Sequence, residues 1–432
     1  MTGAALPDGV DSSVPAQPLD AATGVLGPAH LQVLLDLERT FDRAELERAV
    51  AGTVAAFPVL GSRYVPGAWR DRWVRDPAMT AADAVRLLEP PTDLEAATRD
   101  WLTRELDDRS GWPWRVALLP RDRGCRLLVS VLHTATDAAG TLTAVQELAR
   151  LLMGGPVVER PSGAGRNVGL LFRRLGPEGW MRLVAALGRE AIRPLELPFL
   201  ARTAAVGPMP TGSATWCTVR VDVGEGTPLR ALCRAHGATV NDLLVAALAV
   251  LVRRVSPRGR LGCFYTTDLR RRLADNRPRV ANLSAVLSVG LPRSRAGTLA
   301  EALAEVARRT GRRRPDIAGL AALLYNLPLI QVLPHGLLRP LARRLLVAWI
   351  RRLLTRGLIV TNIGPLDAWL APFGDLLRDA TFVGPSVRPV PVPILTATSF
   401  RNNLTIHFNG YTDTQHELQR LAGELRSVFG TA

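Results

Sequence analysis

The stretch from Cys125 to Met153 constrains the fold of this chain more than any other part of the sequence. Residues 125–132, CRLLVSVL, form a nearly unbroken apolar and β-branched run, which predicts a buried strand. After Thr141 the apolar residues return at the spacing of one helix face, at Leu142, Val145, Leu148, Ala149 and Leu152. The pattern therefore predicts a core strand, a short turn and an amphipathic helix that ends at Gly154.

The predicted turn contains His133 and Asp137. A histidine just beyond a core strand, with a carboxylate four residues later, can act as an oriented general base, because imidazole gains and loses its proton near neutral pH. The structural alternatives are a histidine that caps the end of a strand and an aspartate that caps the helix.

Helices and strands alternate on both sides of this turn, which predicts an α/β fold. On its N-terminal side we expect a strand at 31–37, a helix opened by Asp42 and Glu45, a strand within 57–65, a helix from about Thr92, and a hairpin of 114–119 with 125–132. On its C-terminal side we expect an amphipathic bridging stretch over 170–200 and a second α/β unit from about 214, with helices capped by Thr227 and by Thr239.

These patterns predict four segments in the chain. Residues 1–18 are a loose leader, 19–165 an N-terminal lobe that carries the turn, 166–212 a linker or bridging segment, and 213–432 a C-terminal lobe. A chain of 432 residues is long enough for two such cores.

Arginine supplies all of the positive charge of the chain. All 54 basic residues are Arg, and the formal net charge is +15. A chain without lysine and rich in Ala, Leu and Arg is typical of GC-rich codon usage, as in actinobacteria. A positive field attracts acidic partners such as a carrier protein, coenzyme A or anionic lipid. No motif supports nucleic-acid binding.

No pattern indicates a metal site, a signal peptide or a membrane span. The four cysteines are scattered in apolar stretches without metal-ligand spacing, so we expect free thiols, no metal and a reducing, cytoplasmic location. The N-terminus lacks a basic region followed by an apolar core. The longest uncharged run, 317–338, is interrupted by Asn326, Pro328, Pro334 and His335, which disfavours a transmembrane helix.

Several motifs, in a consistent order, carry a resemblance to a known family. The turn sequence LHTATDA resembles the HHxxxDG signature of the chloramphenicol-acetyltransferase-like superfamily, which includes condensation domains, polyketide-associated acyltransferases and wax ester synthases. Similar matches are ATVNDLLVAALAVLVRR (238–254), YTTDLRRRL (265–273), VANLSAVLSVGLP (280–292) and GLIVTNIGPLD (357–367). The resemblance covers roughly residue 19 to the end. It implies two chloramphenicol-acetyltransferase-like lobes in a V-shaped pseudodimer, with mixed sheets and a tunnel at their interface.

The resemblance also implies roles for individual residues. His133 corresponds to the catalytic base, and Asp137 pairs with Arg270 of the second lobe to hold the turn. Asn362 is a candidate tunnel residue, and Ser399, with Thr396 and Thr398, a candidate oxyanion donor.

Two positions in the turn depart from the family pattern. Leu132 replaces the first histidine and Ala138 replaces the glycine, and the DFGWG element is absent. Leu132 continues the strand and is expected to point away from the turn. Ala138 would cost roughly 1 kcal/mol or more if the turn needs a positive φ there, a strain that Gly140 could relieve.

The function that the resemblance implies is that of a stand-alone condensation-type acyltransferase. It would move an acyl or aminoacyl group from a carrier-protein or coenzyme A thioester to an amine or alcohol, in natural-product assembly, without an intrinsic cofactor. One alternative is a non-catalytic module that binds a carrier protein or a partner enzyme, favoured by the departures just described. Another is a lipid-directed ester synthase, favoured by the arginine-rich amphipathic stretch 339–356.

Overall fold

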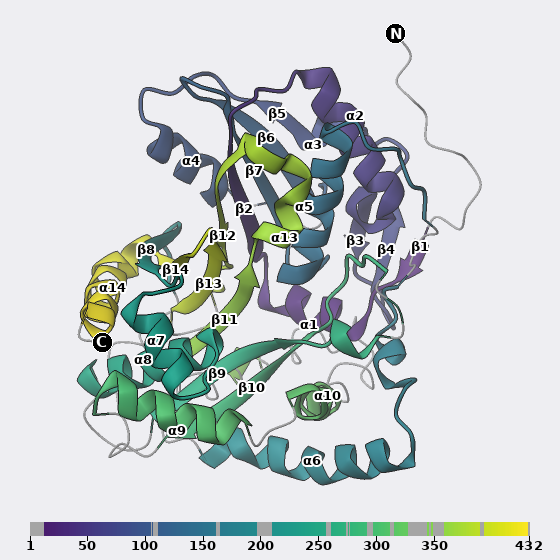
Figure 1. The fold of residues 1–432 in the computed structure, drawn as a ribbon. Helices are drawn as coiled ribbons and strands as arrows, with labels where there is room; N and C mark the ends of the chain where they lie inside the picture. The colour runs from purple at the N-terminus through teal and green to yellow at the C-terminus, as the bar shows by residue number, and fades with distance from the viewer. Residues whose placement is uncertain are drawn as a thin grey trace.

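The computed structural model describes residues 13–104, 106, 111–160, 165–196, 210–255, 261–273, 275, 277–291, 297–311, 315–326, 344, 347–348, 358–388 and 393–430. Two sheets, each with its own hydrophobic core, organise these residues into two lobes (Figure 1). The predicted α/β class with mixed sheets is confirmed. The predicted interface tunnel stays a prediction.

The sheet of the N-terminal lobe has five strands in the order β12-β2-β7-β6-β5. Their bounds are β2 (His30–Leu37), β5 (Val85–Leu87), β6 (Trp114–Pro120), β7 (Cys125–Leu132) and β12 (Leu377–Val383). The helices of this lobe are α1 (Pro18–Leu26), α2 (Arg43–Ala56), α3 (Ala81–Ala84), α4 (Leu94–Thr103) and α5 (Ala138–Leu152). All neighbouring strands are antiparallel except β5 and β6.

Strand β7 lies at the centre of this sheet, as its composition predicts. Every residue of β7 is buried, since α5 and α2 cover one face and α4 packs against the other through Trp101 and Leu102. The predicted capping box of α2 is also confirmed, because Asp42 accepts from the backbone of Glu45 and Glu45 accepts from that of Asp42. These local patterns place the turn of His133 at the end of a rigid central strand.

The sheet of the C-terminal lobe has six strands in the order β10-β9-β11-β13-β14-β8. Their bounds are β8 (Ala214–Asp222), β9 (Leu261–Asp268), β10 (Ser284–Leu291), β11 (Leu358–Pro365), β13 (Ile394–Phe400) and β14 (Asn403–Tyr411). The helices are α6 (Pro177–Glu196), α7 (Pro228–Ala235), α8 (Val240–Val255), α9 (Leu299–Gly311), α10 (Pro315–Asn326) and α14 (Gln415–Gly430), whereas α13 (Asp367–Leu370) packs on the N-terminal lobe. Thr227 and Thr239 precede α7 and α8 as predicted.

Strand β12 belongs by sequence to the predicted C-terminal lobe, yet it completes the N-terminal sheet. It runs antiparallel to β2, with Ala380 opposite Leu35 and Phe382 opposite Val33. Helix α13 likewise packs against α5. The boundary at residue 213 therefore does not separate two independent sheets. An edge strand finds its partner through tertiary pairing, which the alternation of its own residues does not specify.

The predicted leader and linker both contain regular structure. Ser13–Pro15 form β1, which pairs with β4 (Arg72–Arg75), and β4 in turn pairs with β3 (Ser62–Val65). Helix α1 begins at Pro18, so only residues 1–12 of the predicted leader lie outside the described residues. Within the predicted linker, α6 packs against α10.

No single helix among the described residues is long and apolar enough to cross a membrane. Helices α7 and α8 are long and apolar enough only when their lengths are combined, and the two helices meet at a bend of 102°. Helix α8 is largely buried in the core of its lobe. The predicted amphipathic stretch 339–356 lies outside the described residues apart from positions 344 and 347–348.

His407 on β14 connects the two sheets. Its Nε2 lies 2.9 Å from the Thr381 hydroxyl on β12, and its Nδ1 lies 3.1 Å from the Thr218 hydroxyl on β8. Burial, with a further contribution from Arg220, lowers the pKa of His407 to about 3. The imidazole is therefore neutral in the folded protein at mildly acidic pH.

We expect acidification below about pH 6.5 to destabilise the protein, because the unfolded chain then binds a proton at residue 407 that the folded chain excludes until about pH 3. His30 acts in the same direction, since burial and Arg115 lower its pKa to about 4. His407→Gln should reduce the pH slope of the free energy of unfolding by up to about 1.4 kcal/mol per pH unit. Urea unfolding at several pH values measures this slope, and an unchanged slope would contradict the assignment.

Candidate functional site

The turn between β7 and α5 is held by backbone hydrogen bonds where it leaves the strand. The His133 backbone N–H donates to the Ala29 carbonyl at 2.8 Å, and that of Ala135 donates to the Leu132 carbonyl at 2.9 Å. Leu132 is buried in β7 opposite His30 of β2, so this departure from the family signature is a strand residue in the sheet.

The His133 ring has a defined orientation within the turn. Its Nδ1 lies 3.0 Å from the backbone carbonyl of Thr136. A carbonyl oxygen only accepts hydrogen bonds, so Nδ1 carries a proton, and in the neutral imidazole the lone pair is then on Nε2. The side chain is partly exposed, in contrast to its buried neighbours Leu132 and Thr134. His133 is therefore oriented as a base that can accept a proton at Nε2.

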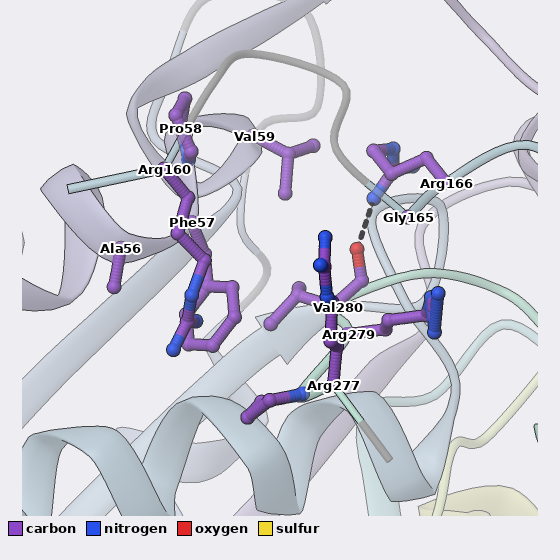
Figure 2. Close-up of a pocket in the computed structure, with 11 residues that line it drawn as sticks. Ala56, Phe57, Pro58, Val59, Arg160, Gly165, Arg166, Arg277, Arg279 and Val280 are labelled. Carbon is purple, nitrogen blue, oxygen red and sulfur yellow. Dashed lines mark hydrogen bonds between the residues drawn. The ribbon is translucent and has the colours of Figure 1, made fainter. Parts of the chain in front are cut away.

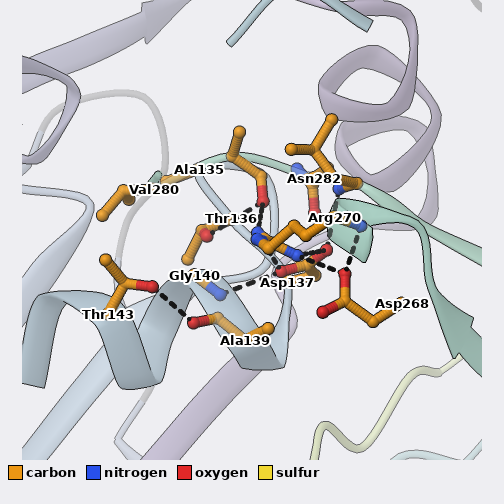
Figure 3. Close-up of polar contacts among 12 residues, drawn as sticks. Ala135, Thr136, Asp137, Ala139, Gly140, Thr143, Asp268, Arg270, Val280 and Asn282 are labelled. Atoms are coloured by element: carbon orange, nitrogen blue, oxygen red, sulfur yellow. Dashed lines mark hydrogen bonds and ion pairs between the residues drawn. The ribbon is translucent and has the colours of Figure 1, made fainter. Parts of the chain in front are cut away.

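Asp137 and Arg270 form the buried ion pair that the resemblance implied (Figure 3). The Arg270 Nη2 donates to Asp137 Oδ1 at 2.8 Å, and Nη1 donates to Oδ2 at 3.0 Å. Arg270 stands in the 3₁₀ turn Arg270–Arg272, directly after β9 of the C-terminal sheet. The two lobes are thus joined by a bidentate contact at the turn of His133.

Asp137 also caps helix α5. Its Oδ1 accepts from the backbone N–H of Gly140 at 3.0 Å, and its Oδ2 accepts from that of Leu283 at 2.7 Å. Burial raises the pKa of Asp137, but the Arg270 guanidinium and these two N–H donors outweigh burial, so that the pKa lies below its usual range. The carboxylate is therefore ionised at neutral pH and serves as helix cap and as ion-pair partner at once.

The segment before β10 contacts several polar groups of the turn. The Ala281 carbonyl accepts from Arg270 Nη2 at 2.7 Å, from the Thr136 hydroxyl at 3.3 Å and from the Asp137 backbone at 3.4 Å. The Asn282 side chain donates to the Thr134 carbonyl at 3.1 Å. Thr136, whose carbonyl orients His133, is thus fixed by the opposite lobe.

A second buried ion pair, which the sequence did not predict, supports the turn. Arg166 Nη2 donates to Asp20 Oδ2 at 2.7 Å, while its Nη1 donates to the carbonyls of Ala135 and Val280 at 2.8 and 2.6 Å. Asp20 is fully buried and also accepts from Asn282 at 2.9 Å. The pair could not be predicted from the sequence, because acidic residues such as Asp20 are common in the first turn of a helix. Arg166 is likewise one of 54 arginines, and no motif marks it.

Ala138 fits the turn without backbone strain. It is the first residue of α5, and the non-glycine residues with positive φ among the described ones are Arg401 and Asn402. The glycine that matters is Gly140, where a Cβ would lie 1.9 Å from the Thr136 hydroxyl and 3.1 Å from Arg270 Nη2. Gly140 therefore permits a close approach, instead of relieving a positive φ at Ala138 as the sequence suggested.

We expect Gly140→Ala to destabilise the protein by about 1–3 kcal/mol, because the new methyl group overlaps the Thr136 hydroxyl in a packed site. Gly423→Ala is the matched control. Gly423 lies in α14, where an added Cβ would meet nothing within 4 Å, so the change should stabilise the helix by about 0.5–1 kcal/mol. Thermal unfolding of both variants measures the difference, and equal stabilisation would contradict the close packing of Gly140.

Asn362 and Ser399 lie on neighbouring strands of the C-terminal sheet. Asn362 is in β11 next to a register shift, and its side chain accepts from the Gly364 backbone at 3.1 Å. Ser399 is in β13 opposite Pro365. Among the described residues, neither side chain has a hydrogen bond to His133, Asp137 or Arg270. Their roles in a tunnel or an oxyanion hole stay predictions. The other two candidates, Thr396 and Thr398, are both buried in β13, and Thr396 accepts from Asn409 at 3.0 Å.

The cysteines have no part in this site. Cys125, Cys217, Cys233 and Cys263 are all free thiols, and burial raises the pKa of Cys125 and of Cys263 to about 12. Such thiols are poor nucleophiles at neutral pH. No group of three or more His, Cys, Asp or Glu side chains within the described ranges could hold a metal ion.

No protein family model matches this sequence, and no curated protein matches it. Solved structures do match over nearly the whole chain. The X-domain from teicoplanin biosynthesis is 20% identical, with a TM-score of 0.63 over 98% of this chain and 97% of that one. The first condensation domain of the calcium-dependent antibiotic synthetase, in complex with a substrate analogue, is 16% identical, with a TM-score of 0.67 over 97% and 96%.

An acetyltransferase is also among the matching structures. The trichothecene 15-O-acetyltransferase from Fusarium sporotrichioides is 12% identical to this chain, with a TM-score of 0.68 over 96% of this chain and 95% of that one. At these identities the likeness concerns the fold. The chain therefore shares the two-lobed α/β fold of this X-domain, this condensation domain and this acetyltransferase.

Proposed function

We propose that this chain is a condensation-type acyltransferase in which His133 is the general base. The observation that carries the proposal is the hydrogen bond from His133 Nδ1 to the Thr136 carbonyl, which leaves Nε2 free to accept a proton. The Asp137–Arg270 pair fixes the turn that presents this ring. The acyltransferase and the condensation domain among the structural neighbours support the same class of reaction.

The proposed reaction transfers an acyl or aminoacyl group from a thioester to an amine or alcohol. The acceptor nitrogen or oxygen attacks the thioester carbonyl while its proton passes to His133 Nε2. The tetrahedral intermediate then expels the thiolate, and the imidazolium donates its proton to the thiolate. The products are an amide or ester and a free thiol. Phosphopantetheine on a carrier protein, or coenzyme A, is the thiol of the donor substrate.

A carrier protein is the partner that we propose for the donor. Condensation domains of peptide synthetases are among the similar structures. The formal net charge of +15 provides a positive field that would speed association with an acidic carrier protein. Such an association should weaken as salt is added, because added ions screen exposed charges beyond about 8–10 Å.

A non-catalytic binding module is the second candidate, and the departures at positions 132 and 138 favour it. In the structure neither departure disturbs the turn, because Leu132 is a strand residue and Ala138 begins a helix. Both departures are therefore compatible with catalysis by His133.

Intact-mass detection of acyl transfer tests the proposal. Acyl and aminoacyl thioesters of a carrier protein and of coenzyme A are each offered with a panel of amines and alcohols. The proposal predicts a product whose mass equals that of the acyl group plus the acceptor minus one hydrogen, in amounts above the reaction without enzyme. Tight binding of the carrier protein without transfer from any donor would instead favour the binding module.

A further inference from the structure

A pocket of about 400 Å³ is lined in part by Arg166, whose Nη1 also donates to the Ala135 carbonyl in the turn of His133. Four arginines line it, Arg160, Arg166, Arg277 and Arg279, together with apolar surface from Phe57 and Val59 (Figure 2). The lining comes from the end of α2, from the segment after α5 and from the segment before β10. Both lobes thus contribute to the pocket.

The pocket carries an excess of positive charge. Arg166 pairs with Asp20 at 2.7 Å, and Asp275 is shared by Arg279 at 2.7 Å and by Arg277 at 3.5 Å. Arg160 has no carboxylate partner among the described residues, and its guanidinium lies over the Phe57 ring at 4.6 Å. Four guanidinium groups and two carboxylates leave a net charge of +2 at this pocket.

Three arginines of the pocket have buried N–H groups without an acceptor among the described residues. These groups are Arg160 Nη1, Arg166 Nε and Arg279 Nε. Single unpaired Nε groups occur on arginines elsewhere, but here three different side chains around one cavity each have one. These three N–H groups have almost no exposed surface, so a ligand in the pocket reaches them only if the side chains rotate, whereas the guanidinium of Arg277, whose side chain is 83% exposed, is directly accessible.

We propose that this pocket binds a phosphate ester. Guanidinium groups bind phosphate through paired, charge-assisted hydrogen bonds, and a net charge of +2 matches a phosphate monoester. A volume of about 400 Å³ exceeds what inorganic phosphate fills, and the apolar wall of Phe57 and Val59 suits an organic substituent. Arg166 contacts both the pocket and the Ala135 carbonyl, so the ligand would lie one side chain from the turn.

Two sources can supply such a ligand. One is the phosphate of the thioester donor, an assignment that rests on the proposed acyltransferase function. The other is a free phosphorylated metabolite unrelated to the donor. Titration calorimetry with the full chain at low salt distinguishes them, with 4′-phosphopantetheine, adenosine 5′-monophosphate and unphosphorylated pantetheine as probes.

The wild-type protein should bind a phosphorylated probe and not pantetheine. The double variant Arg160→Gln/Arg277→Gln should weaken that binding by tenfold or more, since it removes the two guanidinium groups with the weakest carboxylate pairing. Arg43→Gln/Arg420→Gln is the matched control, because both arginines lie on the surface in ion pairs within single helices. If the double variant does not fold, Arg277→Gln alone replaces it, since 83% of the Arg277 side chain is exposed.

Tighter binding of 4′-phosphopantetheine than of the nucleotide would identify the donor as the source. Equal or tighter binding of the nucleotide would identify a free phosphorylated metabolite and would still support the site. Absence of binding by both phosphorylated probes, or equal affinity in wild type and pocket variant, would overturn the proposal. The measurement needs no turnover, so it gives its result even if the chain transfers no acyl group.

Discussion

Replacing Arg270 by methionine should lower the free energy of unfolding by about 3–5 kcal/mol, because it leaves the buried Asp137 carboxylate without its bidentate partner. The loss is large since Asp137 is 3% exposed and the other donors to it are two backbone N–H groups. Urea unfolding, followed by both tryptophan fluorescence and circular dichroism, measures the change.

The control for this prediction is Arg420→Met. Arg420 forms an exposed pair with Glu417 on α14, so its loss should cost no more than about 1 kcal/mol. The double variant Asp137→Asn/Arg270→Met should be more stable than the sum of its single changes predicts, because no buried charge is then left alone. A cost below about 1 kcal/mol for Arg270→Met would show that the pair does not hold the lobes together.

Asp20→Ala should destabilise the protein by a similar amount, about 3–5 kcal/mol, although Asp20 lies far from Asp137 in sequence. It leaves the Arg166 guanidinium, whose side chain is 5% exposed, without its only carboxylate among the described residues. It also removes the acceptor of Trp73 Nε1 and one of the two acceptors of the Asn282 amide, which keeps the Thr134 carbonyl. Because Arg166 and Asn282 both bind carbonyls of the turn, the acyl-transfer rate should fall as well.

Glu45→Ala is the matched control for Asp20→Ala. Both residues are the third residue of their helix and accept from the backbone N–H of the N-cap, Asp20 in α1 and Glu45 in α2. The Glu45 side chain is 25% exposed and pairs with the more exposed Arg39, so its loss should cost only about 1 kcal/mol. Equal losses in both variants would show that Asp20 acts only as a helix cap.

The sequence predicted well those features that depend on neighbouring residues. Strand β7, helix α5 and the cap at Asp42 follow from apolar spacing and from side chains within four residues of one another. The Asp137–Arg270 pair spans 133 residues, and it could be predicted only because the resemblance of LHTATDA and TTDLRRRL supplied the partner.

The features that the sequence did not predict depend on pairing at long range. Strand β12 joins β2 across more than 300 residues, and Asp20 meets Arg166 across 146. Nothing in the local pattern of either partner distinguishes it from other strands or other arginines. The arginine pocket could not be predicted for the same reason, because its lining comes from three separate segments that only the folded chain brings together.

Single-turnover acyl transfer by wild type and by His133→Ala tests most directly whether His133 is the base. The donor and acceptor are the pair that the intact-mass panel identifies, and circular dichroism verifies that the variant is folded. With Nε2 removed, the rate should fall by roughly 10²-fold or more, because the other basic group of the turn, the Asp137 carboxylate, is buried against Arg270. Equal rates in the two proteins would contradict the account and remove His133 from the mechanism.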